Sequence, residues 1–444
     1  MSVEQPAWKA LPDDRAELQF SDAKPAFSEA EAIIEANRCL YCYDAPCIKA
    51  CPAGIDIPAF IKKIATGNIR GSARTIFKSN MLGVSTARVC PVDVLCVGAC
   101  VLNDLNEQPI RIGRLQRYAT AETLEAESRA DWELFTPKAA IGKRVALVGA
   151  GPAALACAAH LVLEGVTAVI YEKDDRPGGL NLTGVAPYKL QSEAALAEAK
   201  WLLRNGVQLK TGVEVGRDIE LEQLIKQYDA IFIGVGLGTD KALGIPGEDG
   251  PGVWGGSGLI RKIKNDPSFE LPDDIQAVVV IGGGNTAIDI ARELAMLGVP
   301  DVKMLYRRTV GEMPGYGHEL QGARKYGVRL LERLTPTAVI RDGDRVTAFR
   351  ATSTVSGVAS DYPCDWVVVA IGQEKHAVHL AEAIEVDEKG RLVVDPRTRR
   401  TGHAKVYAGG DCINGGQEVV NAATDGREAA FAMLRSWDIA PELA

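Results

Sequence analysis

Seven of the ten cysteines in this chain lie in one segment near the amino terminus. The first four have two, four and three residues between successive members, and a proline follows the fourth. The seven are Cys39, Cys42, Cys47, Cys51, Cys90, Cys96 and Cys100. Disulfides are rare in the reducing cytosol, so a dense cysteine cluster in a chain without secretion signals indicates metal ligation.

Iron–sulfur clusters and structural zinc are the two chemistries that such a segment could serve. A ferredoxin-type run that ends in Cys-Pro sends its last cysteine to a different cluster from the others. The run ending at Cys51 and Pro52 has this form, although four residues separate Cys42 from Cys47 where the bacterial pattern has two. Two tetrahedral zinc sites could use the same cysteines.

Two four-iron clusters would need eight ligands, one more than these cysteines supply. The segment contains no histidine, so we expect an oxygen ligand from a nearby polar side chain. The candidates are Asp104, Glu107, Gln108 and Gln116. Spacing alone does not choose among them.

A glycine-rich turn after an apolar strand predicts a first dinucleotide site. Gly149 permits a tight turn, Gly151 lets the backbone approach a pyrophosphate, and Ala154 replaces the usual third glycine. The helix that follows would direct its positive end at the phosphates. Glu172 ends the next strand, where an acid can bind a ribose, and Gly179 completes the Gly-Gly pair of flavoproteins that bind two dinucleotides. The acid and the Gly-Gly pair count against a chance tight turn.

A second glycine-rich turn, also after an apolar strand, predicts a second dinucleotide site. Its residues are Gly282, Gly284, Asn285 and Thr286. The next strand ends in Arg307 and Arg308, with no acid at the ribose position. Arginine makes planar contacts to phosphate through several donors, so the pair suits the 2′-phosphate of NADP. Two arginines that only solvate a strand end are the alternative.

Near the carboxyl terminus, a strand runs into Gly409, Gly410 and Asp411, and a helix is expected to start near Gln417. Asp411 could contact the ribityl chain of a flavin, and the positive end of the helix would face the flavin ring. Together with the first turn, this segment predicts FAD. A flavin domain needs an electron acceptor, which favours two 4Fe-4S clusters over zinc.

These residues require a scaffold of helices and parallel strands. Helical segments are expected at 57–68 and 71–80, and from 144 onward strands and helices alternate, which is typical of the α/β fold class. We expect a helical iron–sulfur domain followed by two Rossmann-like domains. Their predicted bounds are 1–143 for the iron–sulfur domain, 144–250 with 365–444 for the FAD domain, and 251–364 for the NAD(P)H domain.

The composition indicates where in the cell the protein is expected and which classes of partner it is not expected to bind. The chain has 444 residues, 24% of them charged, and a formal net charge of −8. This acidic balance counts against nucleic-acid binding, which needs a basic face. No apolar run reaches the length of a membrane span, and residues 1–30 lack the features of a signal peptide. We therefore expect a cytoplasmic enzyme or enzyme subunit.

Four segments carry a resemblance to a known family. They are Arg38–Cys47, Val89–Cys100, Ile112–Gln116 and Phe232–Leu237. Through them, the chain from about residue 26 to its end resembles the electron-input half of dihydropyrimidine dehydrogenase, which also exists as a separate bacterial subunit. The small subunit of glutamate synthase is similar in architecture.

The resemblance implies two 4Fe-4S clusters, FAD, and NADP(H) or NAD(H), in an adrenodoxin-reductase-like pair of domains. It implies that one cluster is held by Cys39, Cys42, Cys47 and Cys100, and the other by Cys51, Cys90, Cys96 and Gln116. The glutamate synthase branch has an acidic residue in place of this glutamine, so Gln116 favours the pyrimidine branch. Lys189 and Asn285 depart from the arginine and the aspartate that are usual in the family.

The expected function is electron input from NAD(P)H. FAD and the two clusters would pass the electrons to a catalytic subunit with FMN and iron–sulfur clusters, which reduces uracil or thymine to the 5,6-dihydropyrimidine. A hetero-oligomer follows, without nucleic-acid or membrane partners, and no catalytic side chain is expected in this chain. The alternatives are the small subunit of an NADPH-dependent glutamate synthase and a stand-alone module like ferredoxin reductase.

Overall fold

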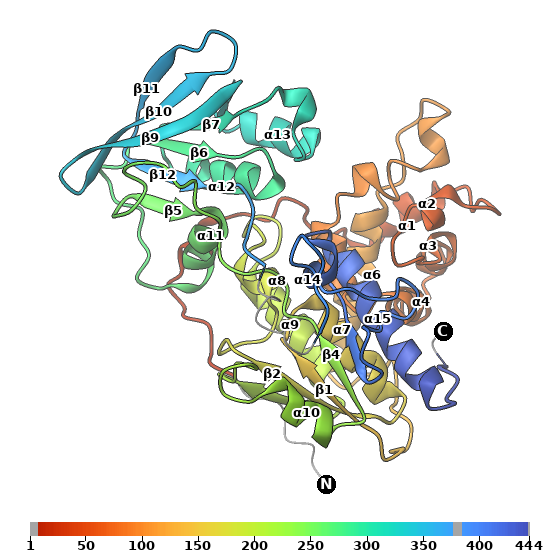
Figure 1. The fold of residues 1–444 in the computed structure, drawn as a ribbon. Coiled ribbons are helices and arrows are strands. Elements are labelled where there is room, and N and C mark those ends of the chain that lie inside the picture. Colours follow the sequence, from red (N-terminus) through yellow and green to blue (C-terminus); the bar gives the residue numbers. More distant parts are fainter. Residues whose placement is uncertain (1–7, 376–383, 443–444) are drawn as a thin grey trace.

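The computed structural model describes residues 8–375 and 384–442. The outermost residues of the predicted domains, 1–7 and 443–444, lie outside this range. Figure 1 shows a helical unit and two α/β units, with the first α/β unit in contact with both others. The α/β class and the amino-terminal helical unit are as the sequence predicts.

The helical unit is a bundle of short helices around one apolar core. Helix α1 begins with a capping box, in which Ser28 and Glu31 each accept from the other's backbone N–H. Phe60, Ile61 and Ile76 are fully buried in the core, and the cysteines lie at its rim. The elements are α1 Glu29–Asn37, α2 Pro46–Lys49, α3 Ile57–Ala65, α4 Ile69–Ser79, α5 Gly83–Val89, η2 Val92–Val94, η3 Val101–Asn103 and α6 Ile112–Ser128. The preceding short helix, η1 Ala16–Gln19, packs instead against the second α/β unit.

The first α/β unit has a parallel sheet in the order β13-β4-β1-β2-β3. The inner strands β4, β1 and β2 are buried on both faces, which explains why they are largely apolar, whereas the edge strand β3 is polar and partly exposed. The strands are β1 Arg144–Val148, β2 Thr167–Glu172, β3 Gln208–Thr211, β4 Ala230–Ile233 and β13 Val406–Ala408. The helices are α7 Pro152–Leu163, α8 Leu180–Thr183, α9 Ser192–Leu203, α10 Leu221–Gln227, α14 Asp411–Asn414 and α15 Val419–Ser436.

The second α/β unit has a parallel sheet in the order β5-β12-β6-β7-β8 and a separate antiparallel sheet in the order β11-β10-β9. Its parallel strands are β5 Val253–Gly255, β6 Ala277–Ile281, β7 Asp301–Tyr306, β8 Arg329–Glu332 and β12 Trp366–Val369. Its helices are α11 Gly256–Asn265, α12 Asn285–Met296, η4 Val310–Glu312 and α13 Gly317–Arg324. The antiparallel strands are β9 Leu334–Asp342, β10 Arg345–Ser353 and β11 Ala359–Pro363.

Strand β12 corrects one predicted boundary. The sequence assigns residues from 365 onward to the FAD domain, but β12 pairs with β6 of the second sheet. The chain therefore returns to the first unit after Val369 rather than after residue 364. Both sheets take buried parallel strands, so the apolar run of β12 fits either sheet, and only the pairing distinguishes them.

A buried carboxylate joins the helical unit to the first α/β unit. Glu198 on α9 accepts from the backbone N–H groups of Val84 and Ser85, at 2.7 and 3.1 Å, at the start of α5. Burial raises the pKa of Glu198 to about 7, although its hydrogen bonds with Ser85 lower it. Nearby, the rings of Phe77 and Trp201 pack with centroids 4.4 Å apart. The two units therefore share a hydrogen-bonded and apolar interface.

An amino-terminal strap, residues 9–24, runs along the junction of the units (Figure 1). Arg176 donates to the backbone carbonyls of Lys9 and Ala10, and Glu17 accepts from the Ser192 N–H at 2.8 Å. On α11, the buried Lys264 donates to the carbonyls of Asn181, Val185 and Leu190. Burial lowers the pKa of Lys264 to about 8, opposed by the nearby Glu17.

Within the residues that the structure describes, no helix is long and apolar enough to cross a membrane.

Helices α7 and α15 approach closely at a glycine, which generates a stability prediction. A Cβ at Gly426 would lie 2.1 Å from the Ala153 carbonyl oxygen. Gly426→Ala should force the helices apart and lower the free energy of unfolding by about 1–3 kcal/mol. Gly402→Ala is the matched control, because nothing lies within 4 Å of its Cβ position. Thermal unfolding followed by circular dichroism measures both, and equal midpoints would contradict the packing argument.

Candidate functional site

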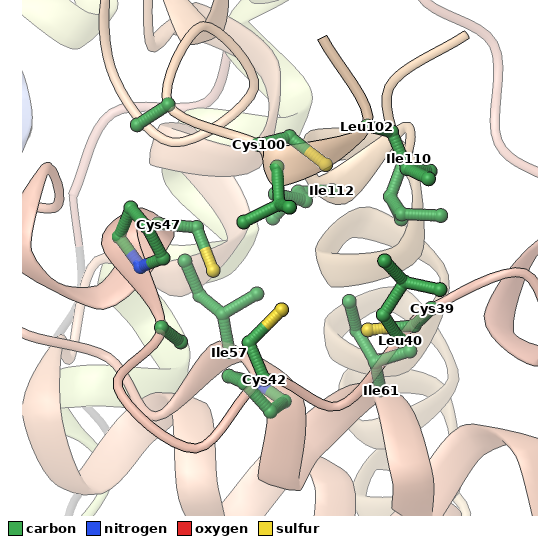
Figure 2. A pocket seen from close by; sticks show the side chains of 15 residues that line it. Cys39, Leu40, Cys42, Cys47, Ile57, Ile61, Cys100, Leu102, Ile110 and Ile112 are labelled. Atoms are coloured by element: carbon green, nitrogen blue, oxygen red, sulfur yellow. The ribbon is translucent and has the colours of Figure 1, made fainter. Parts of the chain in front are cut away.

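Four thiols surround one cavity in the helical unit. Figure 2 shows the sulfur atoms of Cys39, Cys42, Cys47 and Cys100 directed into it. Cys39 follows α1, Cys47 lies in α2, and Cys100 precedes η3, so three separate elements bring the thiols together. The rest of the wall is largely apolar and includes Leu40, Ile57, Ile61, Leu102, Ile110 and Ile112.

The electrostatics of this first thiol group suit a cationic metal centre. Burial, together with the neighbouring Cys39 and Cys100, raises the pKa of Cys47 to about 11. Burial likewise raises the pKa of Cys39. Such thiols stay protonated at neutral pH unless a metal displaces their protons and compensates the thiolate charges. The donor set therefore fits a cluster bound by thiolates.

Cys51, Cys90 and Cys96 form a second thiol group, which lies toward the α/β units. Burial raises the pKa of Cys96 to about 12, with Cys51 adding to the effect. The pKa of Cys90 is also raised, first by burial and then by Cys96 and Cys51. Among the described residues, no three His, Cys, Asp or Glu side chains converge as ligands of a single metal ion.

The structure separates Gln116 from the other candidates for the eighth ligand. Asp104, Glu107 and Gln108 are exposed, whereas Gln116 is buried on α6. Its amide nitrogen donates to the Gly83 carbonyl at 2.9 Å and to the Thr86 hydroxyl at 3.0 Å. A carbonyl can only accept, so this contact fixes which way the amide faces. Its oxygen accepts no hydrogen bond from the part of the chain that the structure describes.

The glycine segments predicted for FAD meet at the carboxyl end of β1. The Gly178 N–H donates to the Ala150 carbonyl at 2.8 Å, and a Cβ at Gly179 would lie 2.8 Å from the Gly151 Cα. Gly149 has φ +92°, and its Cβ would lie 2.6 Å from the Gly234 carbonyl oxygen. Ala154 is fully buried in α7 and packs against the end of β4. This cradle without side chains fits a pyrophosphate.

Glu172 ends β2 beside the same turn. Its carboxylate accepts from the Ala150 N–H at 2.6 Å and from the Asp174 N–H at 2.8 Å. Burial raises its pKa, although both hydrogen bonds lower it. The carboxylate is thus held at the edge of the glycine turn. Its contact with a ribose stays a prediction.

The third FAD segment joins this cradle from the other end of the chain. A Cβ at Gly410 would lie 3.2 Å from the Ala153 Cβ, next to the start of α7. Asp411 accepts from the Gln417 N–H at 3.1 Å, and burial raises its pKa. Helix α15 starts at Val419, close to the predicted position. Asp425, which the sequence analysis did not identify, accepts from the Gly410 N–H at 2.9 Å.

The second glycine turn lies between β6 and α12, as expected. A Cβ at Gly282 would lie 2.2 Å from the Ala370 carbonyl oxygen, whereas the Cβ position of Gly284 is open. Asn285 begins α12, and its side chain accepts from the Tyr316 N–H at 2.9 Å. The methyl group of Thr286 faces the start of α11. Open space at Gly284 beside a helix amino terminus fits a phosphate group.

A loop that the sequence analysis missed closes over this turn. The Gly315 N–H donates to the Gly283 carbonyl at 2.9 Å, and the next residue, Tyr316, bonds Asn285. The Tyr316 hydroxyl donates to Glu418 at 2.8 Å, immediately before α15. The loop therefore connects the second glycine turn to the flavin-side helix. The Pro-Gly pair at 314–315 could have marked this tight turn.

Arg307 and Arg308 extend from the end of β7, and a third arginine joins them. Strands β7 and β8 pair Tyr306 with Glu332, which places Arg333 beside Arg307. The Arg333 N–H donates to the Arg308 carbonyl at 3.1 Å, with Arg333 in the left-handed region at φ +57°. No described residue forms an ion pair with these three arginines. Three unpaired guanidinium groups at one edge suit a phosphate.

Two family models together match most of the chain. One, described as dihydropyrimidine dehydrogenase domain II, 4Fe-4S cluster, matches residues 16–128. The other, described as pyridine nucleotide-disulphide oxidoreductase, matches residues 143–426. These ranges correspond to the helical unit and to the two α/β units.

Two curated relatives are equally similar and have different roles. The glutamate synthase (NADPH) small chain of Halomonas elongata is 35% identical, covering 95% of this chain and 94% of its own. The NAD-dependent dihydropyrimidine dehydrogenase subunit PreT of Escherichia coli is 35% identical, covering 93% of this chain and 96% of its own. Among solved structures, T. acidophilum thioredoxin reductase has a TM-score of 0.55 at 22% identity over 66% of this chain and 98% of its own, which shows the fold alone.

The three arginines at the ends of β7 and β8 generate a prediction about the nicotinamide cofactor. Replacing Arg307 and Arg308 with Ala should lower kcat/KM for NADPH by about 10- to 100-fold relative to NADH, because only NADPH has a 2′-phosphate to which charged hydrogen bonds form. Arg333→Ala should act in the same direction. Arg329→Ala is the matched control, since Arg329 is paired with Asp301. An unchanged NADPH/NADH ratio in all variants would show that the arginines only solvate the strand ends.

Proposed function

Because this chain belongs to the pyridine nucleotide-disulphide oxidoreductases and has an amino-terminal 4Fe-4S domain of the dihydropyrimidine dehydrogenase type, we propose that it is the electron-input subunit of a dihydropyrimidine dehydrogenase. It is an NAD(P)H-dependent oxidoreductase with FAD and 4Fe-4S clusters. In this proposal, a separate FMN-containing cytoplasmic subunit reduces uracil or thymine to the 5,6-dihydropyrimidine.

Each cofactor has a proposed set of residues. FAD is assigned to Gly149, Gly151, Ala154, Glu172, Gly179 and Asp411, and the nicotinamide cofactor to Gly282, Gly284, Asn285, Thr286, Arg307 and Arg308. When bound, FAD accepts a hydride and releases single electrons, which 4Fe-4S clusters can carry. The chain's own residues contribute phosphate binding at two helix amino termini, and the loop at 309–316 holds the second glycine turn through Gly315 and Tyr316.

The proposed cluster ligands combine the two thiol groups with the family resemblance. The first set is Cys39, Cys42, Cys47 and Cys100. The second is Cys51, Cys90 and Cys96, with Gln116 added because the resemblance implies it. The second group lies close to Glu418, the residue immediately before α15. The first lies beside the exposed Leu40 and Tyr43, whose exposed fractions are 54% and 105%. Exposed apolar side chains next to a redox site suit contact with a partner subunit.

The observation that carries the choice of partner is the placement of Gln116. Its amide oxygen is left without a hydrogen bond from the described residues, while its nitrogen is bound twice. A carbonyl oxygen that accepts no hydrogen bond can serve as a metal ligand. The family resemblance implies a glutamine ligand in the pyrimidine branch. Electron input to a glutamate synthase large subunit is the second candidate, supported by the Halomonas elongata relative.

A substitution at Gln116 tests the ligand assignment. Purified anaerobically, the wild-type protein should contain about eight iron atoms per chain, as two four-iron clusters require. Gln116→Ala should remove or shift one of two cluster signals in electron paramagnetic resonance and leave the FAD content unchanged. Gln108→Ala, at the exposed candidate, should change neither signal. Two unshifted signals in Gln116→Ala would remove the main support for the pyrimidine branch.

The partner is tested by reconstitution. Alone, the protein should oxidise NAD(P)H with artificial dyes and should not reduce uracil. Mixed with an FMN-containing dihydropyrimidine dehydrogenase catalytic subunit, it should form dihydrouracil in proportion to the NAD(P)H consumed. A glutamate synthase large subunit, supplied with glutamine and 2-oxoglutarate, is the control. Uracil reduction by the isolated chain, or product formation only with the control subunit, would overturn the proposal.

A further inference from the structure

The strap ends at a point where the helical unit and both α/β units meet. Its last residue, Lys24, is fixed through its backbone: the Lys24 N–H donates to Asp22 at 2.8 Å, and Arg117 on α6 donates to the Lys24 carbonyl. The preceding Ala23 N–H donates to the Tyr188 carbonyl at 2.9 Å in the first α/β unit. Arg117 also pairs with Asp22. These backbone contacts alone therefore fix the position of Lys24, independently of its side chain.

The side chain of Lys24 reaches the backbone of Cys90, a member of the second thiol group. Its ammonium nitrogen lies 3.1 Å from the Arg88 carbonyl oxygen and 3.3 Å from the Cys90 carbonyl oxygen. Cys90 is the residue at which α5 ends, and Cys51 and Cys96 are its neighbouring thiols. A lysine in this place caps a helix carboxyl terminus, which is a structural role. The same contact also places a cation beside a proposed cluster ligand.

Other charged groups surround this point. Lys24 interacts electrostatically with Lys189 of the first α/β unit and Glu319 on α13 of the second. Asp93 of the helical unit also interacts with it electrostatically. Burial lowers the pKa of Lys24, and Glu319 raises it. Glu319 itself is bound by Lys189, at 2.9 Å, so it does not form an ion pair with Lys24. Glu418 raises the pKa of Cys90, whereas Lys24 lowers it.

We propose that Lys24 is a positioned charge that raises the reduction potential of the cluster held by Cys51, Cys90, Cys96 and Gln116. Reduction adds one negative charge to a cluster, and a fixed cation within a few ångström stabilises the reduced form more than the oxidised form. Screening by salt is reduced because Lys24 and Cys90 are half-buried where the three units meet. This proposal rests on the proposed function, since it uses its ligand assignment. It identifies the strap as part of the electron-transfer machinery rather than a structural extension.

The test is an anaerobic redox titration followed by electron paramagnetic resonance. Lys24→Met and Lys24→Gln should both shift the midpoint potential of one cluster signal to more negative values and leave the other signal in place. Lys24→Arg keeps the charge and should stay near the wild-type value. Lys9→Met removes the same charge from the exposed start of the strap, where Lys9 lies 3.9 Å from Asp175, and should shift neither signal.

The variants separate charge from helix capping. Glutamine can still donate hydrogen bonds to the two carbonyls, so a shift in Lys24→Met alone would assign the effect to capping and overturn the proposal. Unshifted potentials in both uncharged variants would also overturn it. Loss of iron in Lys24→Met and Lys24→Gln, with iron retained in Lys24→Arg, would overturn it as well, because the charge of Lys24 would then be needed for cluster assembly. A Cys90→Ala variant, which has no donor atom at this position, would instead refute the ligand assignment of the proposed function if it kept both cluster signals.

Discussion

The buried carboxylate of Glu198 is the contact on which the arrangement of this protein depends. It belongs to the first α/β unit, yet it caps α5, the helix that ends at Cys90 and supplies the Gly83 carbonyl to Gln116. A buried charge without partners would be costly, so these backbone donors and Glu198 require each other. Through α5, the second thiol group is thereby attached to the first α/β unit as well as to the helical unit.

The sequence was sufficient wherever the chemistry is local. The glycine turns at 149 and 282 follow strands β1 and β6 as expected, because a buried parallel strand followed by a tight turn has a distinctive pattern. Cysteine type and spacing indicated the metal-binding unit, which the family model confirms as a 4Fe-4S domain. Gln116 was one of four candidates from the residues themselves, and only the family resemblance selected it.

What the sequence could not provide depends on pairing between distant segments. The apolar run of β12 suits either sheet, and its place was known only from its pairing with β6. Arg333 comes beside Arg307 because β8 lies next to β7, and Tyr316 reaches Asn285 through a loop folded back on the turn. Lys24 stands in a polar amino-terminal stretch with no motif. Its neighbours, Cys90 and Glu319, are remote in the chain.

The strap also has a consequence for the order of folding. It leaves the ribosome well before the groups that hold it, Arg176, Ser192 and Lys264, are synthesised. Its docking sites exist only after both α/β units have formed, and the second sheet itself waits for β12. The strap must therefore be among the last segments to reach its final position. Burial of the strap would then report that a nascent molecule has completed its interdomain assembly.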